Sequence, residues 1–278
     1  MRVRLVLAAG SAVGIAAVGS FIRWRRSWGV APGEAALALP GDELVADPTG
    51  VDTRGITIDA PPELVWPWLV QMGFGRGGWY SIDQLDMRGS SPHRIVDEWQ
   101  RLEVGDIVAT YPGGGFEVKV LEPGRTLVLY TDTAIVERQA AAERSATLEP
   151  TPPGLAVSGV MLGATPQQFA ASWTFDVEPT GEGRTRLVER VRVRFEGTTP
   201  GSAIMTQLLG AGVFVMMQRQ MVGIRARAEK VARDRATLTG APESPPKLAD
   251  QVPVMAPSNG SAGPGEPSDW TVAEPANL

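Results

Sequence analysis

The chain has 278 residues, of which 43% are hydrophobic and 21% are charged, and it contains no cysteine. This composition predicts a folded core, and the lack of cysteine excludes disulfides, thiolate metal sites and a cysteine nucleophile. A single histidine, His93, excludes sites built from several histidines, so we predict neither a metal nor a cofactor. The net charge of −5 argues against a general nucleic-acid binder, which needs a basic surface.

Residues 1–28 predict an N-terminal membrane anchor. Residues 5–22 are uncharged and long enough to cross a bilayer as one helix. Arginines flank this run on both sides, and Trp24 and Trp28 follow it where interfacial aromatic residues are expected. A cleaved signal peptide is the alternative, although no A-x-A cleavage site follows the run. Both flanks carry similar positive charge, but the tight arginine cluster at 23–26 favours a single-pass protein of the cell membrane with a cytoplasmic body.

An irregular lead-in at 29–52 precedes a folded domain at 53–235. The predicted elements, in chain order, are a strand at 55–58, a helix from 59 to about 72 with a bend at Pro67, a short helix at 81–87, strands at 106–110, 116–121 and 126–132, an ambiguous stretch at 133–168, strands at 171–177 and 185–195, and a long helix at 201–235. Alternation places Phe116, Val118 and Val120 on one face of their strand.

The order of these elements predicts an α+β fold. An antiparallel sheet with one apolar face must cover that face, and only the long C-terminal helix is large enough to do so. Beyond it, residues 236–278 contain eight prolines and five acidic residues against one lysine, and they show no apolar periodicity. We therefore predict a disordered, acidic, proline-rich tail.

Several motifs resemble the SRPBCC superfamily of START-like, helix-grip proteins, which includes polyketide cyclase/dehydrase-like branches. They are the ITIDAP run at 56–61, VWPWL at 65–69, GGWYS at 77–81, RIV at 94–96 and EWQ at 98–100. They look like an actinobacterial subgroup that often carries an N-terminal membrane segment. The resemblance covers about residues 40–235. It implies a curved antiparallel sheet that wraps around the long C-terminal helix and an apolar cavity, and it implies no catalytic residues.

Three residues are candidates for acid–base chemistry: Tyr80, His93 and Glu189. Strand parity places Glu189 on the same face as Leu187 and Val191, where a carboxylate in an apolar cavity would have a raised pKa. The alternative, which we favour, is a strand-end or bulged residue that reaches water. For His93 we favour an exposed loop position over a general acid or base at the rim of a pocket.

An apolar cavity would be lined by aromatic, methionine and leucine side chains. The candidates for ligand binding are Trp79, Tyr80, Arg94, Trp99, Phe116, Trp173, Met205, Leu208, Leu209 and Met217. Ordinary core packing is the alternative for the apolar members, and we expect it for Trp173. An ion pair with Asp97 or Glu98 is the alternative for Arg94.

Three functions follow from this inventory. The first is a membrane-anchored binder or carrier of a hydrophobic small molecule or lipid. The second is an aromatase/cyclase-like enzyme that acts on a polyketide-like or other apolar substrate. The third is a protein-interaction module whose interior is filled by its own side chains. A cavity would separate the first two from the third, and converging buried polar groups would favour the enzyme.

Overall fold

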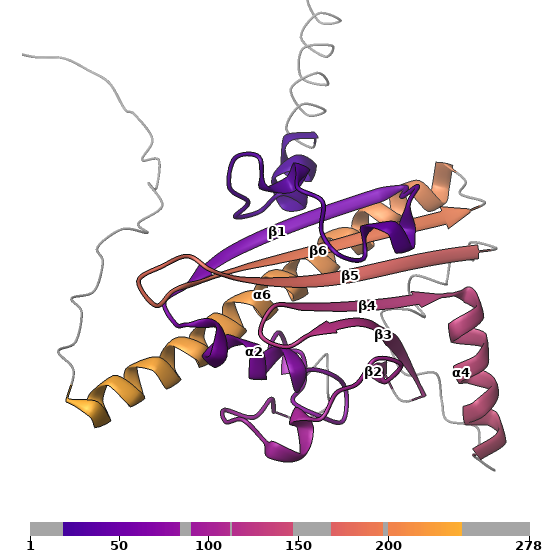
Figure 1. Ribbon diagram of the computed structural model, residues 1–278. Helices are drawn as coiled ribbons and strands as arrows, with labels where there is room; N and C mark the ends of the chain where they lie inside the picture. Colours follow the sequence, from indigo (N-terminus) through magenta and orange to yellow (C-terminus); the bar gives the residue numbers. More distant parts are fainter. Residues whose placement is uncertain (1–18, 84–89, 112, 147–167, 197–199, 241–278) are drawn as a thin grey trace, which may run out of the picture. The chain divides into compact units, whose positions relative to one another are not determined.

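In the computed structural model, the described residues are 19–83, 90–111, 113–146, 168–196 and 200–240 (Figure 1). Within them, six antiparallel strands form one sheet in the order β1-β6-β5-β4-β3-β2. The strands are β1 (Gly50–Ile58), β2 (Ile107–Tyr111), β3 (Gly114–Glu122), β4 (Thr126–Asp132), β5 (Gln168–Pro179) and β6 (Thr185–Glu196). The helices are η1 (Glu34–Ala36), η2 (Asp42–Val45), α2 (Pro62–Val70), η3 (Asp97–Gln100), α4 (Thr133–Ala146) and α6 (Pro200–Thr239). The predicted α+β architecture, with its antiparallel sheet and long C-terminal helix, is confirmed.

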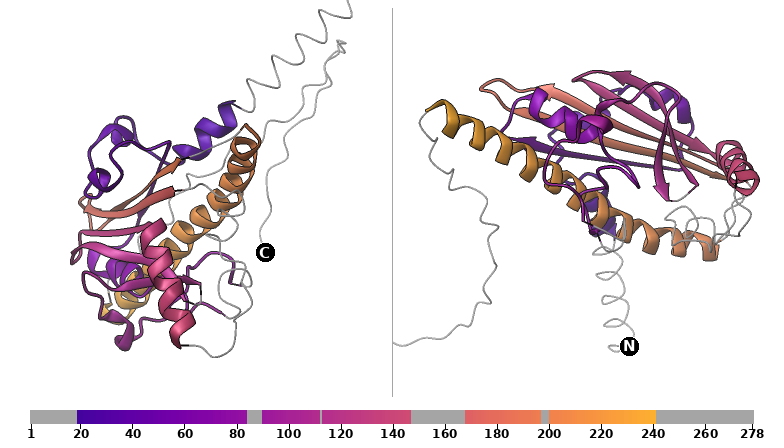
Figure 2. Two further views of the ribbon diagram at one scale, coloured as in Figure 1. Left: turned by 90° about the vertical axis from the view of Figure 1, so that its right-hand side faces the viewer. Right: turned by 90° about the horizontal axis from the view of Figure 1, so that it is seen from below.

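The core lies between α6 and one face of the sheet, which we call the inner face (Figure 2). On α6 the buried apolar side chains recur every three or four residues, as one face of a helix requires; they are Phe214, Met217, Met221, Ile224 and Ala228. Helix α2 packs beside α6 and begins at a pair of prolines, which suit the first helical turn. Pro67 lies inside α2, which ends three residues later.

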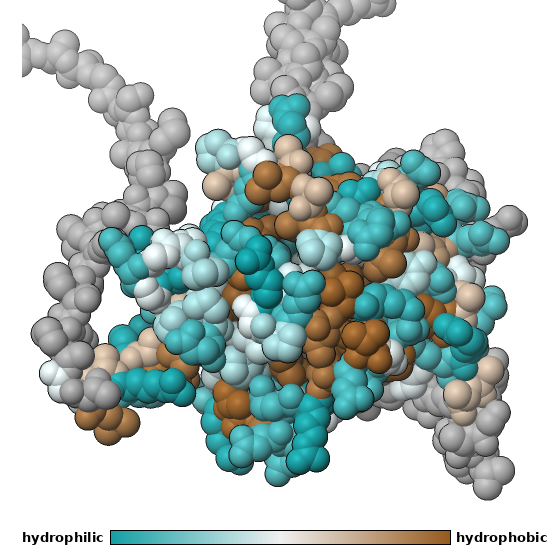
Figure 3. All heavy atoms as spheres, viewed as in Figure 1, coloured by the Kyte–Doolittle hydropathy of each residue, from teal (hydrophilic) through white to brown (hydrophobic). Residues whose placement is uncertain are grey.

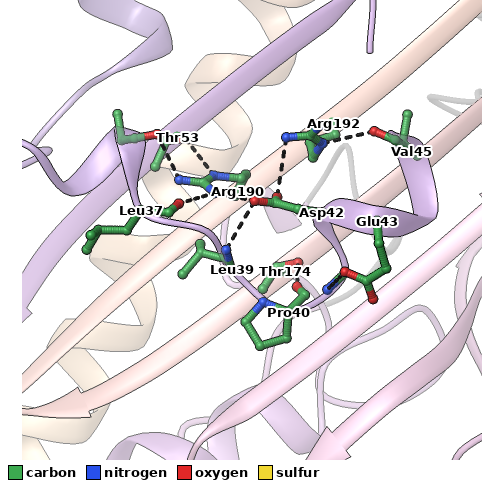
Figure 4. A network of polar contacts seen from close by, with 12 residues as sticks. Leu37, Leu39, Pro40, Asp42, Glu43, Val45, Thr53, Thr174, Arg190 and Arg192 are labelled. Atoms are coloured by element: carbon green, nitrogen blue, oxygen red, sulfur yellow. Dashed lines mark hydrogen bonds and ion pairs between the residues drawn. The ribbon is translucent and has the colours of Figure 1, made fainter. Parts of the chain in front are cut away.

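The opposite, outer face of the sheet is covered in part by residues 29–49, which we call the strap. Three arginines of β6 contact it. Nε of Arg186 donates to Glu34 at 2.7 Å. Arg190 and Arg192 lie 2.7 and 3.5 Å from the carboxylate of Asp42 (Figure 4). Figure 3, viewed from this outer side, shows polar residues around an apolar area near the centre of the sheet. Most of the predicted irregular lead-in is thus the strap, which packs on the sheet through defined ion pairs and hydrogen bonds.

A bulge in β3 corrects the predicted facing of its residues. Val118 pairs with Leu129, but the next pair joins Val120 to Val128, so Lys119 is the extra residue. Because one extra residue reverses the alternation, Val120 lies with Val128 on the outer face. It therefore does not share the inner face with Val118.

Several predicted boundaries also change. β1 begins at residue 50, so the last residues of the lead-in belong to the sheet, and α6 continues to residue 239, past the predicted start of the tail. The ambiguous stretch begins with α4. The rest of that stretch, most of the short helix at 81–87 and the tail from 241 onward lie outside the described residues.

The N-terminal segment is described only from residue 19, where a helix runs to residue 26. Most of the predicted span at 5–22 therefore lies outside the described residues. Among the helices that are described, none is both long and apolar enough to cross a bilayer. Trp24 is half exposed, whereas Trp28 packs against the core, and its carbonyl accepts a hydrogen bond from the amide of Gly55 at 3.1 Å. Trp28 therefore contacts the folded domain.

Candidate functional site

A fully buried carboxylate lies on the inner face of the sheet. Glu189 is in the middle of β6, opposite Arg54 on β1 and Phe175 on β5. The pairing of β6 with both neighbours is continuous across this position, so no bulge turns the side chain toward water. The indole Nε1 of Trp173 donates a hydrogen bond of 2.7 Å to its Oε1. The interpretation of Glu189 as an inward-facing residue holds, and the preferred alternative was wrong.

Arg54 is the second buried charge of this site. Its side chain is fully buried, and Nη2 donates to the carboxylate of Asp52 at 2.8 Å. Nη1 lies 3.3 Å from the sulfur of Met217, and the guanidinium lies 5.5 Å from the centre of the Phe214 ring. β1 and α6 together therefore hold the guanidinium between the sheet and the helix.

Two polar atoms of this pair lack a hydrogen-bond partner among the described residues: Oε2 of Glu189 and Nε of Arg54. Directly opposed residues of an antiparallel pair have Cβ atoms about 5 Å apart, so both atoms belong to one small region. A buried polar atom without a partner costs about 1–3 kcal/mol, and more when the group is charged. A group that both donates and accepts hydrogen bonds would satisfy both atoms.

Burial also changes the protonation of the carboxyl group. It raises the pKa of Glu189 to about 7, although the positive charge of Arg54 and the hydrogen bond from Trp173 act in the opposite direction. A carboxyl group with such a pKa is populated in both protonation states near neutral pH. Glu189 can thus accept a hydrogen bond as a carboxylate or donate one as an acid.

An aromatic cluster adjoins the carboxylate. The rings of Trp79 and Trp173 stack with their centres 5.2 Å apart and an interplanar angle of 16°. Phe116 meets Trp173 edge-on at 5.8 Å, and Phe175 lies 5.0 Å from it. Of the predicted ligand-binding residues, Trp79, Phe116 and Trp173 are therefore brought together beside Glu189. Met217 lies at the same site, because its sulfur contacts Nη1 of Arg54.

Tyr80 belongs to a different cluster. Its hydroxyl donates to the carbonyl of Trp68 at 3.0 Å, and the guanidinium of Arg227 lies 4.7 Å from the centre of its ring. Burial raises the pKa of Tyr80 well above its ordinary value. The backbone is in the left-handed region, with φ of 56°, and Gly223 of α6 leaves the space that this turn needs. These contacts fit a structural residue better than a catalytic acid.

The remaining candidates do not join the site. His93 and Arg94 are exposed, and Trp99 is half-buried. The carbonyl of Arg94 accepts a hydrogen bond from the buried side chain of Gln71 at 3.4 Å, which ties this segment to the end of α2. The side chains of residues 200–209 are outside the description, and this range includes Met205, Leu208 and Leu209.

Sequence reasoning missed Arg54 and Asp52. The signal was present, because both residues lie at even positions that continue the inward alternation of Ile56 and Ile58. The predicted strand began only at Gly55, so neither residue was assigned to a face.

Comparisons with known proteins leave the family open. No family model matches the sequence, and no curated protein matches it. Among solved structures, a protein from Mesorhizobium loti is 17% identical, with 64% of this chain and 97% of that chain covered and a TM-score of 0.32. A protein from Arthrobacter aurescens is 17% identical, with 65% and 86% covered and a TM-score of 0.36. A hypothetical protein from Helicobacter pylori is 11% identical, with 69% and 95% covered and a TM-score of 0.39.

Proposed function

We propose that this protein binds a small, largely apolar molecule between its sheet and α6, and that the polar end of this molecule meets Glu189 and Arg54. The observation that carries the proposal is the pair of buried polar atoms, Oε2 and Nε, that lack partners among the described residues. A ligand hydroxyl, or another group that donates and accepts, supplies both missing hydrogen bonds. The adjoining stacked rings of Trp79 and Trp173 offer a flat apolar surface to the rest of the ligand.

The proposal includes a membrane anchor at residues 5–22, with the body on the cytoplasmic side. It is supported by the uncharged run, by its length and by the flanking arginines. Because the chain has no cysteine, one engineered cysteine reports the side of the membrane. In intact cells, a membrane-impermeant thiol reagent should leave a cysteine in the body unlabelled, and the chain should resist carbonate extraction. Labelling in intact cells would reverse the orientation, and carbonate release would remove the anchor.

Native mass spectrometry of the full chain, released from nanodiscs, tests ligand binding. We expect a co-purified molecule of defined mass in the wild type. Arg54→Met should lower its retention by about tenfold or more, because a hydrogen bond to a charged group contributes about 1.5–3 kcal/mol. Arg125→Met is the matched control, since this arginine is 55% exposed and pairs only with Glu178 among the described residues. Near-UV circular dichroism of the tryptophans verifies that each variant is folded.

Two negative results together would refute ligand binding. If the wild type releases no molecule, and a panel of fatty acids, sterols and polyketide-like aromatics leaves its melting temperature unchanged, the interior is filled by the protein itself. The interaction-module hypothesis then replaces the carrier.

A second candidate function is acid–base catalysis on the bound molecule. The pKa of Glu189, near 7, favours it, because a general acid or base works best when its pKa is close to the operating pH. Once the ligand is identified, Glu189→Gln distinguishes the two functions. A carrier retains its ligand and shows no turnover in either form. An enzyme keeps binding in the variant but loses turnover by about two to four orders of magnitude.

A further inference from the structure

We propose that the body itself docks on an anionic lipid surface, through a face formed by the outward side of α6 and the helix at residues 19–26. This docking face consists of Phe21, Trp24, Val215, Arg219 and Val222. Phe21 also belongs to the expected anchor at 5–22, but the contact goes beyond that anchor, because it uses α6 of the folded domain and predicts which side of the domain faces the bilayer.

The two parts of the docking face adjoin. The ring of Trp24 meets that of Phe214 on α6 edge-on, with centres 5.3 Å apart, and Phe21 lies 5.8 Å from Trp24. Gly210 allows this approach, because a Cβ there would lie 2.6 Å from the guanidinium of Arg25. Phe21 is nevertheless 49% exposed and Trp24 50% exposed. Two large rings at the surface are the side chains that a lipid headgroup region accommodates well.

α6 continues this surface on its outward side. Val215 and Val222 are 43% and 37% exposed, and the exposed residues between and beside them recur at spacings of three or four; they are Gly212, Arg219 and Ala226. Met217, Met221 and Ile224 lie on the side of α6 away from Val215 and Val222 and belong to the core. Phe214 lies between the two sides, where it meets Trp24. Apart from Arg219, the outward side of α6 is thus apolar over this stretch, whereas an ordinary surface helix is polar on its outer side.

The charge of the docking face selects its partner. The sequence contains no aspartate or glutamate at 1–33 or at 197–228, and Arg23 and Arg219 are exposed within these stretches. Asp52, which lies beside Arg26, already contacts Arg26 and Arg54. Arginines beside exposed aromatic and aliphatic side chains, with no acid among them, complement anionic lipid headgroups. A second copy of the chain fits less well, because two such faces would repel each other.

The lack of cysteine makes a site-specific test direct. The full chain carrying Val222→Cys is labelled with a fluorophore such as bimane and mixed with vesicles of phosphatidylcholine that contain about one quarter phosphatidylglycerol. Iodide then reports exposure to water, and brominated lipid reports contact with the bilayer. Val104→Cys is the matched control, because Val104 is 63% exposed but precedes β2 at the far edge of the sheet.

On addition of vesicles, we expect brominated lipid to quench the label at 222. Quenching of this label by iodide should fall about threefold or more, while the label at 104 stays accessible to iodide. Arg219→Glu in the Val222→Cys background, or vesicles of phosphatidylcholine alone, should reduce the protection, because about 1 kcal/mol of attraction is lost for each basic residue. Equal iodide quenching at 222 and 104 refutes the docking. So does protection at 222 without quenching by brominated lipid, which indicates a protein contact. Carbonate extraction reports on the anchor independently, so the two proposals can fail separately.

Discussion

The protonation of Glu189 should make the stability of this protein depend on pH in a direction opposite to that of most carboxylates. Its pKa is about 7 in the folded state against an ordinary value of 4.5. The folded protein therefore binds more protons than the unfolded chain between these values, and stability falls as the pH rises from about 4.5 to about 7. At about 1.4 kcal/mol for each tenfold difference in proton affinity, the full effect is about 3 kcal/mol.

Glu189→Gln removes this dependence. Glutamine mimics the protonated carboxyl group, and its carbonyl oxygen still accepts the hydrogen bond from Trp173. The variant should match the wild type at about pH 4.5 and exceed its free energy of unfolding by about 3 kcal/mol at about pH 8. Urea unfolding of the full chain in detergent, followed by near-UV circular dichroism, measures both values. Glu178→Gln is the matched control, because Glu178 is half exposed and pairs with the exposed Arg125.

Two results would refute the reasoning. A stability difference that is the same at both pH values would mean that Glu189 does not titrate between 4.5 and 7. A variant less stable than the wild type at about pH 8 would mean that Arg54 stabilises the carboxylate by more than burial destabilises it. In that case the two residues form a closed ion pair, and their atoms are not available to a ligand.

Two further predictions concern packing and the strap. Gly77→Ala should lower the free energy of unfolding by about 1–3 kcal/mol, because the added Cβ would lie 2.7 Å from a backbone oxygen. Gly212→Ala is the control: it lies in open space on α6 and should be neutral or stabilise by up to about 1 kcal/mol. Equal changes of the two variants in urea unfolding would contradict this prediction. Asp42→Asn should speed proteolysis within residues 29–49, because it deprives the buried Arg190 of its charged partner. The control Asp47→Asn changes an exposed residue and should not affect the cleavage rate. Equal cleavage of both variants would show that other contacts hold the strap.

Local patterns predicted the sheet well because most of its pairing is local. Turns at 123–125 and 180–184 join strands that are neighbours both in sequence and in space, and the alternation of β5 and β6 is regular. The same regularity placed Glu189 on the inner face. Arg54 was missed because the predicted strand began at Gly55, five residues after β1 begins. Val120 was misplaced because a bulge leaves no mark in an otherwise alternating segment.

The strap could not be predicted because its partners are distant in sequence. Glu34 and Arg186 are 152 residues apart, and neither the proline content nor the weak apolar pattern of residues 29–49 indicates a contact with β6. An arginine on the outward face of a strand is ordinarily solvated. Only the tertiary structure shows that acids of the strap meet them.

The position of β1 beside β6 has a consequence for the order in which the chain folds. β1 leaves the ribosome first among the strands, yet its only described strand partner is the last one made, and the strap contacts that same last strand. Strands β2 to β5 can pair as they emerge, whereas residues 29–58 must wait until residue 196 is synthesised. Such late, long-range closure is slow because the loop entropy must be overcome before the contacts form. β6 is therefore the element whose synthesis allows both the sheet and the strap to close, and a nascent chain stalled before it leaves the backbone N–H and C=O groups at the edge of β5 unpaired.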